Sequence, residues 1–360
     1  MLPDNETAPT PQLRKPTAVE VILKYGVPLL ISVGLCYLLF SRINFQEMIT
    51  IIRTECNFWW IFLMMAISIL SHVLRALRWN IQLQALGVKA PKFVLILSIF
   101  GTYAVNLVLP RLGELWRSGW IARRQKAPFD TVFGSMVGDR LADTVMVALM
   151  TFLTFLLAKS QIMLYFSENS QTMENLIATL SSPWLWLGIA AAAGVIWWVF
   201  MKFDNIKIIA KTKQFLIGIW QGFAVLAKMK GKGLWLFYTF AMWFCYYLQL
   251  YVAFFAFPLT AEMAATYGPI AILLCFCLTS ISMGVPSNGG IGPWQWALIF
   301  GISMYAASIP GLTTQYATSF ANLVMGATTL LLIALGIFTF ICIIFMKRRN
   351  IPADVIDSNS

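Results

Sequence analysis

Long apolar runs alternate with short charged stretches along this chain. From Gly233 to Met346 the only formally charged residue is Glu262. Because a helix needs about 20 residues to cross a bilayer, such a stretch has room for several crossings. The pattern predicts an all-α polytopic membrane protein, with apolar segments at about residues 21–40, 58–78, 93–109, 131–158, 183–201, 234–257, 267–285, 293–309 and 320–346.

Composition agrees with a hydrocarbon environment. Apolar residues make up 59% of the chain and charged residues 11%, whereas a soluble domain carries roughly 25% charged residues. The net charge of +11 does not indicate a nucleic-acid partner, because the basic residues cluster in short loops beside apolar segments. This is the positive-inside pattern of a protein in the cytoplasmic (inner) membrane.

Loop charges predict an orientation. Basic stretches at 75–92, 202–232 and 347–349 are expected in the cytoplasm, and the acidic loops 160–182 and 258–266 outside. Both termini are then cytoplasmic. The predicted layout is a polar tail at 1–18, a single membrane domain at 19–346 with an amphipathic cytoplasmic linker at 202–232, and a cytoplasmic tail at 347–360.

Residues 110–126 conflict with a simple series of crossings. They are strongly basic and would lie outside if 93–109 crossed fully, yet 131–158 must begin inside to deliver 160–182 outside. A re-entrant hairpin resolves this conflict. Residues 93–109 enter from the cytoplasm, the chain turns at Leu109 and Pro110, and the amphipathic stretch 112–124 returns.

A second broken hairpin is predicted at 267–309. Its arms are joined by residues 283–292, which are rich in glycine and proline and carry no charge. Two ordinary crossings also satisfy the charge rule here, so both readings stay open. With the hairpin, residues 19–160 and 183–346 become inverted halves, and together they hold six full transmembrane helices and two re-entrant hairpins. Inverted repeats with discontinuous helices are typical of transporters.

Charged residues of the first hairpin are candidates for substrate contact. Arg111, Glu114 and Arg117 recur every three residues and share one side of a returning half-helix, and Asn106 lies just before the turn. The alternative is an interfacial amphipathic helix whose charges are simply solvated. We favour burial because Pro110 and the charge conflict both indicate a hairpin.

A second cluster comprises Asp139, Arg140 and Asp143. The two acids are four residues apart and share a helix face. Because charges within a membrane are usually paired, we expect the acids to neutralise Arg111 or Arg117. The alternative is a boundary cluster in contact with lipid headgroups.

The glycine-rich turn is the third candidate. Asn288, Gly289, Gly290 and Gly292 allow positive φ angles and close backbone approach. Free amides at the start of a half-helix attract anions such as a lipid phosphate. If both hairpins bind one headgroup, their tips near Pro110 and Asn288 must lie close together.

No residue pattern indicates a cofactor or a metal site. The cysteines show no zinc or disulfide spacing, and His72 is the only histidine, expected to be satisfied near the membrane boundary. A nucleophile and base in catalytic spacing are also lacking, so we expect no enzymatic activity. An intramembrane transferase is therefore the weakest of the functional alternatives.

The motifs Leu-Pro-Arg-Leu-Gly-Glu-x-x-Arg from Leu109, Asp-Arg-x-x-Asp from Asp139 and Gly-Gly-Ile-Gly from Gly289 resemble the lysylphosphatidylglycerol synthase transmembrane family. This is the flippase-like domain of the multiple peptide resistance factor, which also exists as stand-alone proteins. The resemblance implies translocation of a lipid, best known for aminoacylated phosphatidylglycerol. Gln295 stands where the family often has glutamate, which weakens the case for a cationic substrate.

We therefore expect a flippase-like transporter of a phospholipid, aminoacylated or not, or of a lipid-linked headgroup. Membrane lipids are its expected partners; a homodimer and a separately encoded lipid-modifying enzyme are both compatible with the sequence. No aminoacyltransferase domain follows before Ser360, so the chain is not expected to synthesise the lipid. The rival hypothesis is a non-transporting membrane scaffold for a separately encoded glycosyltransferase or lipid synthase.

Overall fold

The computed structural model describes residues 45–109, 111–168, 229–285, 287 and 289–349, together with scattered positions between 174 and 194. All helices named below belong to the compact unit that begins at Asn44. Within these ranges every regular element is helical. The expected segment 21–40, most of the expected segment 183–201 and most of the linker 202–232 lie outside the described residues, so they remain predictions.

Five helices of the described part are long and apolar enough to cross a membrane, which makes the chain a multi-pass membrane protein. Their sequences are predominantly apolar over at least one membrane thickness. These helices are α4 (Phe58–Ala85), α7 (Phe129–Leu157), α12 (Lys232–Ala253, extended by the short η2 at Phe254–Ala256), α13 (Pro258–Ser282) and α15 (Thr314–Arg349).

Shorter helical pieces occupy both expected hairpin regions. Helix α5 (Lys92–Val108) has 17 residues and α6 (Leu112–Gln125) has 14, which corresponds to about 25 and 21 Å at 1.5 Å per residue. Helix α13 is broken at Gly268, where φ is 70° and ψ is −168°, just before Pro269. Helix α14 (Pro293–Ala306) again has 14 residues. Each straight piece is shorter than the hydrocarbon core of about 30 Å.

Three expectations about loops are wrong. Helix α4 continues to Ala85, so the supposed basic loop at 75–92 is helical over much of its length. Helix α8 (Lys159–Glu168) occupies the first part of the expected outer loop at 160–182, and α13 starts within the expected loop at 258–266. A further helix that we did not predict, α3 (Phe45–Glu55), precedes α4. These stretches mix polar and apolar residues, so mean hydropathy does not identify them.

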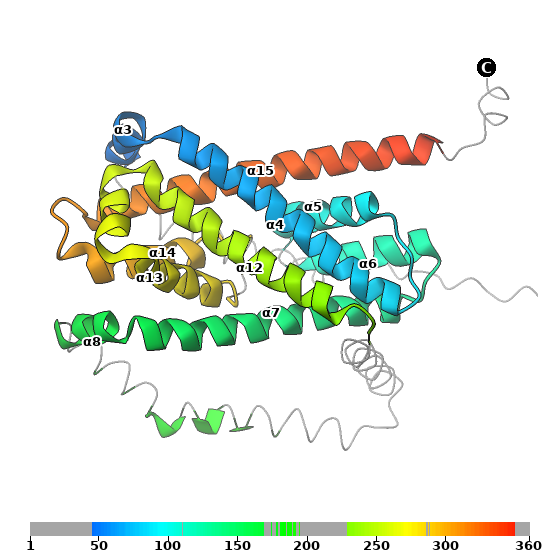
Figure 1. Ribbon diagram of the computed structural model, residues 1–360, viewed down its shortest axis with the longest axis horizontal. Coiled ribbons are helices and arrows are strands. Elements are labelled where there is room, and N and C mark those ends of the chain that lie inside the picture. Colours follow the sequence, from blue (N-terminus) through cyan, green and yellow to red (C-terminus); the bar gives the residue numbers. More distant parts are fainter. Residues whose placement is uncertain are drawn as a thin grey trace, which may run out of the picture. The chain divides into compact units, whose positions relative to one another are not determined.

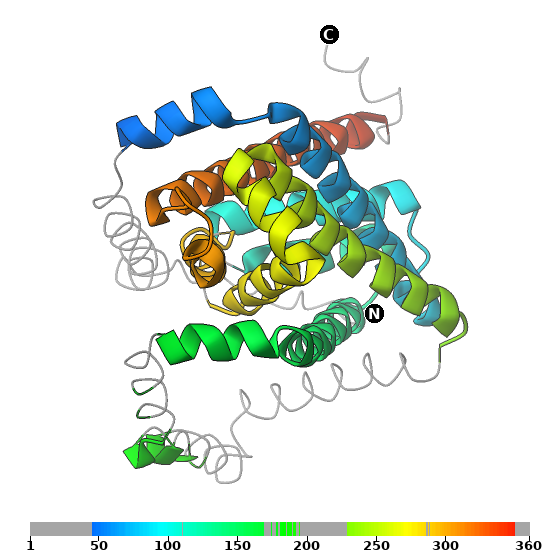
Figure 2. The ribbon, with the colours of Figure 1, turned by 60° about the vertical axis from the view of Figure 1, so that its left-hand side comes forward.

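The long helices pack in a regular arrangement. Helices α4 and α12 lie side by side and run in opposite directions (Figure 1). Helix α5 packs against α15, and α13 packs against α7. The pair α5–α6 lies near the end of α4, whereas α13–α14 lies near its beginning, and the second view shows the same separation (Figure 2).

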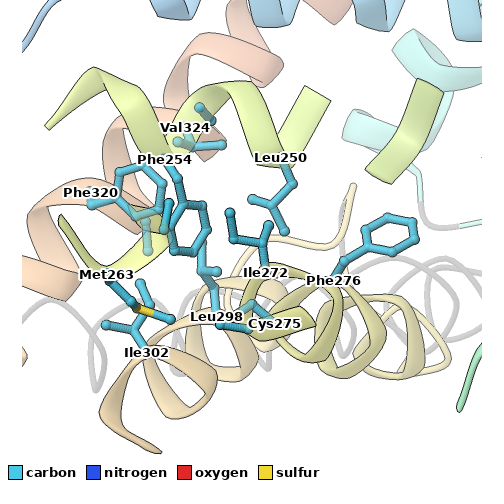
Figure 3. Packing of buried hydrophobic residues seen from close by; sticks show 14 of the residues in the cluster. Leu250, Phe254, Met263, Ile272, Cys275, Phe276, Leu298, Ile302, Phe320 and Val324 are labelled. Atoms are coloured by element: carbon cyan, nitrogen blue, oxygen red, sulfur yellow. The ribbon is translucent and has the colours of Figure 1, made fainter. Parts of the chain in front are cut away.

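Two apolar cores correspond to these two regions. The larger core joins α12, α13, α14 and α15, and Figure 3 shows Phe254 and Phe320 within it, with ring centroids 5.0 Å apart. The smaller core joins the second half of α4 to α5, α6 and the start of α7, and includes Trp79, Leu95 and Ile121. Each core therefore contains one pair of short helices.

Glycines allow the short helices to cross closely. A Cβ at Gly113 of α6 would collide with the backbone oxygen of Thr102 on α5. A Cβ at Gly301 of α14 would lie 2.8 Å from the Cys275 sulfur of α13. At Gly113 the obstacle is backbone, which cannot move aside as a flexible side chain does. At Gly301 the Cys275 Cα lies close as well, at 3.1 Å.

Candidate functional site

A buried charge cluster joins α4 to α7. Its residues come in two matched pairs: Arg75 and Arg78 are three apart on α4, and Asp139 and Asp143 are four apart on α7, so each pair presents one helix face. Arg75 forms an ion pair with Asp143. Arg78 donates from Nε to Asp139 Oδ1 over 2.9 Å and from Nη2 to Asp143 Oδ1 over 2.8 Å.

Arg117 brings α6 into the same cluster. Its side chain is completely buried, its Nη2 lies 3.7 Å from Asp139 Oδ2, and its guanidinium lies 4.4 Å from the ring centroid of Trp79. Trp79 is held in turn by donating to Ser135 Oγ over 3.0 Å. A guanidinium stacked on an indole and facing a carboxylate is favourable where water is excluded.

The edge of the cluster is more accessible. Arg140 pairs with Glu114, and these two side chains are 37% and 15% exposed. Asn106 donates to Glu114 Oε2 over 3.2 Å and accepts from the backbone N–H of Gly113 over 2.8 Å. Asn106 therefore fixes the turn between α5 and α6 and orients the carboxylate at the same time.

The cluster carries a surplus of positive charge. Four arginines, at 75, 78, 117 and 140, meet three carboxylates, at 114, 139 and 143. Among the residues described, four guanidinium nitrogens of the cluster and one carboxylate oxygen have no hydrogen-bond partner: Arg75 Nε, Arg78 Nη1, Arg117 Nε, Arg117 Nη2 and Asp139 Oδ2. Donors left without a partner in a dry interior are costly, so the cluster favours an additional anion or polar group nearby.

The tips of the two short-helix pairs meet. Arg111 Nη2, at the turn between α5 and α6, donates to the backbone oxygen of Gly284 over 2.7 Å. A Cβ built on Gly289 would lie 2.6 Å from Leu107 Cδ2. The expected proximity of the tips is confirmed by these contacts, although Pro110 and Asn288 themselves lie outside the described residues.

Unusual backbone conformations occur at both tips. Arg111 adopts a φ of 61°, a left-handed conformation that costs a side-chain-bearing residue roughly 1–2 kcal/mol. Gly289, Gly290 and Gly292 have φ values of 62°, 86° and 96°, as expected for that turn. Gln295 accepts from the N–H of Gly292 over 2.7 Å and donates to Asn322 Oδ1 over 2.7 Å, so its amide fixes the start of α14.

The expected charge partners need correction. Arg111 has an exposed side chain and contacts a carbonyl oxygen rather than Asp139 or Asp143. Arg117 does face Asp139, but Arg75 and Arg78 are the main partners of the two acids. Both arginines belong to the basic stretch 75–92, which the positive-inside pattern predicts as a cytoplasmic loop. Their spacing, which matches that of the acids, was the signal that could have identified them.

His72 also differs from expectation. It is buried on α4, and neither ring nitrogen has a hydrogen-bond partner among the described residues. Its ring instead packs against Tyr103, with centroids 4.4 Å apart and an interplanar angle of 32°. A histidine satisfied at the membrane boundary was therefore a wrong prediction.

The described residues bring no three histidine, cysteine, aspartate or glutamate side chains together in a metal-binding arrangement.

In comparisons with known proteins, the family described as the lysylphosphatidylglycerol synthase TM region matches residues 27–336. No curated protein and no solved structure matches the chain. Since the family match covers most of its length, the chain belongs to the family of lysylphosphatidylglycerol synthase TM regions.

Proposed function

We propose that this chain translocates a phospholipid, or a lipid-linked headgroup, across the cytoplasmic membrane by passing the headgroup between the tips of two re-entrant hairpins. Family membership supports lipid translocation. The observation that carries the proposal is the contact between Arg111 and the Gly284 carbonyl oxygen. This contact supports the proposal because it brings an exposed cation at the turn between α5 and α6 up to the residues that follow α13.

Helix packing supports an inverted repeat. Exchanging the first-half helices α4, α5, α6 and α7 with α12, α13, α14 and α15 preserves most of the neighbour pairs; the contacts of α4 with α7 and with α15 are the exceptions. Helix α4 packs on α12, α5 on α15 as α13 on α7, and α6 on α7 as α14 on α15. Helices α7 and α15 also run in opposite directions (Figure 1). Transporters built from inverted repeats hold their substrate between discontinuous helices near the bilayer midplane.

The lengths of the short helices support re-entrant hairpins over full crossings. Helix α5 is about 25 Å long and α14 about 21 Å long. Neither spans the hydrocarbon core of about 30 Å, yet both pass its middle. Irregular backbone at that depth is tolerated where it is buried in protein or lines a wet cavity. The two turns meeting there satisfy the first condition, and the exposed Arg111 indicates the second.

Arg111 is the residue that we assign to the lipid phosphate. An arginine exposed to hydrocarbon at this depth is costly, so its position is best explained by a water-containing space. One N–H of its guanidinium contacts Gly284, which leaves the rest of the fork for a phosphate. Glu114 lies about one helical turn after Arg111 and pairs with Arg140 of α7, and both side chains are partly exposed. They offer polar contacts to the remainder of the headgroup.

The buried cluster has a different proposed role. Arg117 and Asp139 are completely covered, so in this conformation they hold α6 against α4 and α7 rather than touch a headgroup. The surplus positive charge of the cluster makes the neighbouring space attractive to an anion. Arg117 and the two acids therefore act as positioning residues.

We also propose that both termini lie in the cytoplasm, and we assign no chemical reaction to the chain.

The test is a translocation assay with the purified chain in vesicles. A phosphatidylglycerol carrying a fluorescent acyl-chain label is reduced from outside with dithionite, which bleaches only the outer leaflet. Arg111→Gln is expected to slow equilibration about tenfold or more, because charge-assisted hydrogen bonds contribute roughly 1.5–3 kcal/mol. Arg124→Gln, an exposed control on the same helix, should equilibrate like the parent. Equal rates for Arg111→Gln and the parent would contradict the assignment, and parental rates equal to those of empty vesicles would contradict translocation of this lipid.

A further inference from the structure

The face of α6 opposite the charge cluster carries a hollow of about 680 Å³. Trp116, Gly119 and Trp120 line it from α6, and Phe129 lines it from the start of α7. Arg117 lies on the other side of α6 and is buried. The hollow is within the size range of small-ligand sites, about 300–1,000 Å³.

Aromatic rings form an apolar wall. Trp116 and Trp120 stack with centroids 5.5 Å apart and an interplanar angle of 14°, and Trp116 packs edge-on against Phe340 of α15 at 5.7 Å. Gly119 lies between them in sequence and opens the space, since a Cβ there would meet only the Phe129 ring, at 3.9 Å. Such a surface suits the glycerol and upper acyl region of a lipid.

Two cations complete the hollow. Arg123 and Lys126 line it and are exposed, and no acidic residue is among its lining. Neither cation forms a salt bridge with any residue in the described part of the chain. The hollow therefore has an apolar wall of tryptophan rings and, beside it, two cations that are available to bind an anion.

The depth of the hollow is indicated by a neighbouring contact. Arg124, beside Arg123, reaches the sulfur of Met346 with Nη2, at 3.8 Å. Met346 is the last residue of the apolar span of α15, and the sequence continues with Lys347 and two arginines. The cations therefore lie at the edge of the hydrocarbon, where tryptophan rings and basic residues commonly meet lipid headgroups. In the orientation proposed above, this edge is cytoplasmic.

We propose that this hollow binds one anionic phospholipid of the cytoplasmic leaflet. Its phosphate lies between Arg123 and Lys126, and its glycerol and upper acyl carbons lie on Trp116 and Trp120. This site is separate from the hairpin tips. Its occupancy does not depend on Arg111 or on translocation.

Binding is tested on the full chain in neutral detergent by native mass spectrometry, with phosphatidylglycerol and phosphatidylcholine added in turn. We expect phosphatidylglycerol to be retained preferentially. A basic residue near an anionic lipid surface contributes about 1 kcal/mol, or about fivefold in affinity. The double variant Arg123→Gln, Lys126→Gln should therefore bind phosphatidylglycerol roughly 25-fold more weakly, and Arg124→Gln should bind it like the parent.

Gly119→Leu separates a specific site from general surface charge. It fills the hollow, keeps both cations and removes a helix-interior glycine, so folding should be retained; an unfolding temperature no lower than that of the parent checks this. Loss of the retained lipid is the expected result. Four results would each overturn the proposal: equal binding of phosphatidylcholine, an equal effect of Arg124→Gln, undiminished binding by a folded Gly119→Leu, or complete displacement by inorganic phosphate, which would indicate a site for a soluble anion.

Discussion

Arg111 donates a hydrogen bond to the backbone oxygen of Gly284 over 2.7 Å, although 173 residues separate them in sequence. This bond joins the turn between α5 and α6 to the residues that follow α13. Helix α6 is itself held to α4 and α7 by Arg117 and its buried neighbours. Our proposal requires a hairpin whose helix is held firmly by its neighbours and whose turn contacts the turn of the other hairpin. Helix α6 and the Arg111–Gly284 hydrogen bond have this geometry in the first hairpin.

Asp143→Ala is expected to lower the stability of the protein by about 3–5 kcal/mol, because it leaves Arg75 and Arg78 without their shared buried partner. Thermal unfolding in detergent measures the loss. Asp130→Ala is the matched control on the same helix, since Asp130 is exposed and, within the described part of the chain, accepts a hydrogen bond only from the adjacent N–H of Thr131. Adding Arg75→Met to Asp143→Ala should restore part of the stability. Rescue by Arg111→Met instead would contradict the pairing described here.

Gly113 and Gly119 of α6 are expected to respond in opposite ways to alanine. At Gly113 the new Cβ collides with the backbone of α5, whereas at Gly119 it has ordinary contact only with Phe129. Gly113→Ala should therefore lower the unfolding temperature and slow translocation. Gly119→Ala should raise stability by up to about 1 kcal/mol through helix propensity. Equal tolerance at both positions would show that α5 and α6 do not cross so closely.

The first hairpin is predicted to return to the cytoplasm. A single cysteine at the exposed Lys126 in a cysteine-free background should react with an impermeant thiol reagent only when the reagent reaches the cytoplasmic face. A cysteine at Thr313, exposed between α14 and α15, should react from outside. Ser118 is completely buried, so a cysteine there should resist labelling from either side. Labelling of position 126 by reagent added outside would contradict the re-entrant hairpin.

Sequence alone predicted much of the helical framework, because long apolar runs indicate membrane-spanning helices and charged loops indicate their orientation. The clash between the basic residues 110–126 and a full crossing by 93–109 also predicted that α5 and α6 form a pair. The contact between the tips followed from requiring one headgroup to meet both hairpins, and it is confirmed by Arg111 and Gly284.

The charge cluster was predicted less well. Arg75 and Arg78 lower the hydropathy of α4 and resemble a loop signal, whereas inside the fold they neutralise two acids that lie more than 60 residues away in sequence. Hydropathy averages over one segment and cannot identify a partner on another helix. Helices α3 and α8 were missed for a related reason, because tertiary packing stabilises short helices that have mixed composition.

The most direct test of the central claim is to lock the hairpin tips together. Leu107 Cγ lies 3.8 Å from a Cβ built on Gly289, which is close enough for cysteines at both positions in a cysteine-free chain to form a disulfide. The single variant Gly289→Cys controls for the strain that a side chain introduces at the φ of 62° there. Translocation of labelled phosphatidylglycerol in vesicles is then measured before and after reduction, with each single cysteine variant as a control. The account predicts that the cross-linked protein is inactive and that reduction restores its rate. Translocation at the uncross-linked rate with the disulfide intact would contradict passage of the headgroup between the tips.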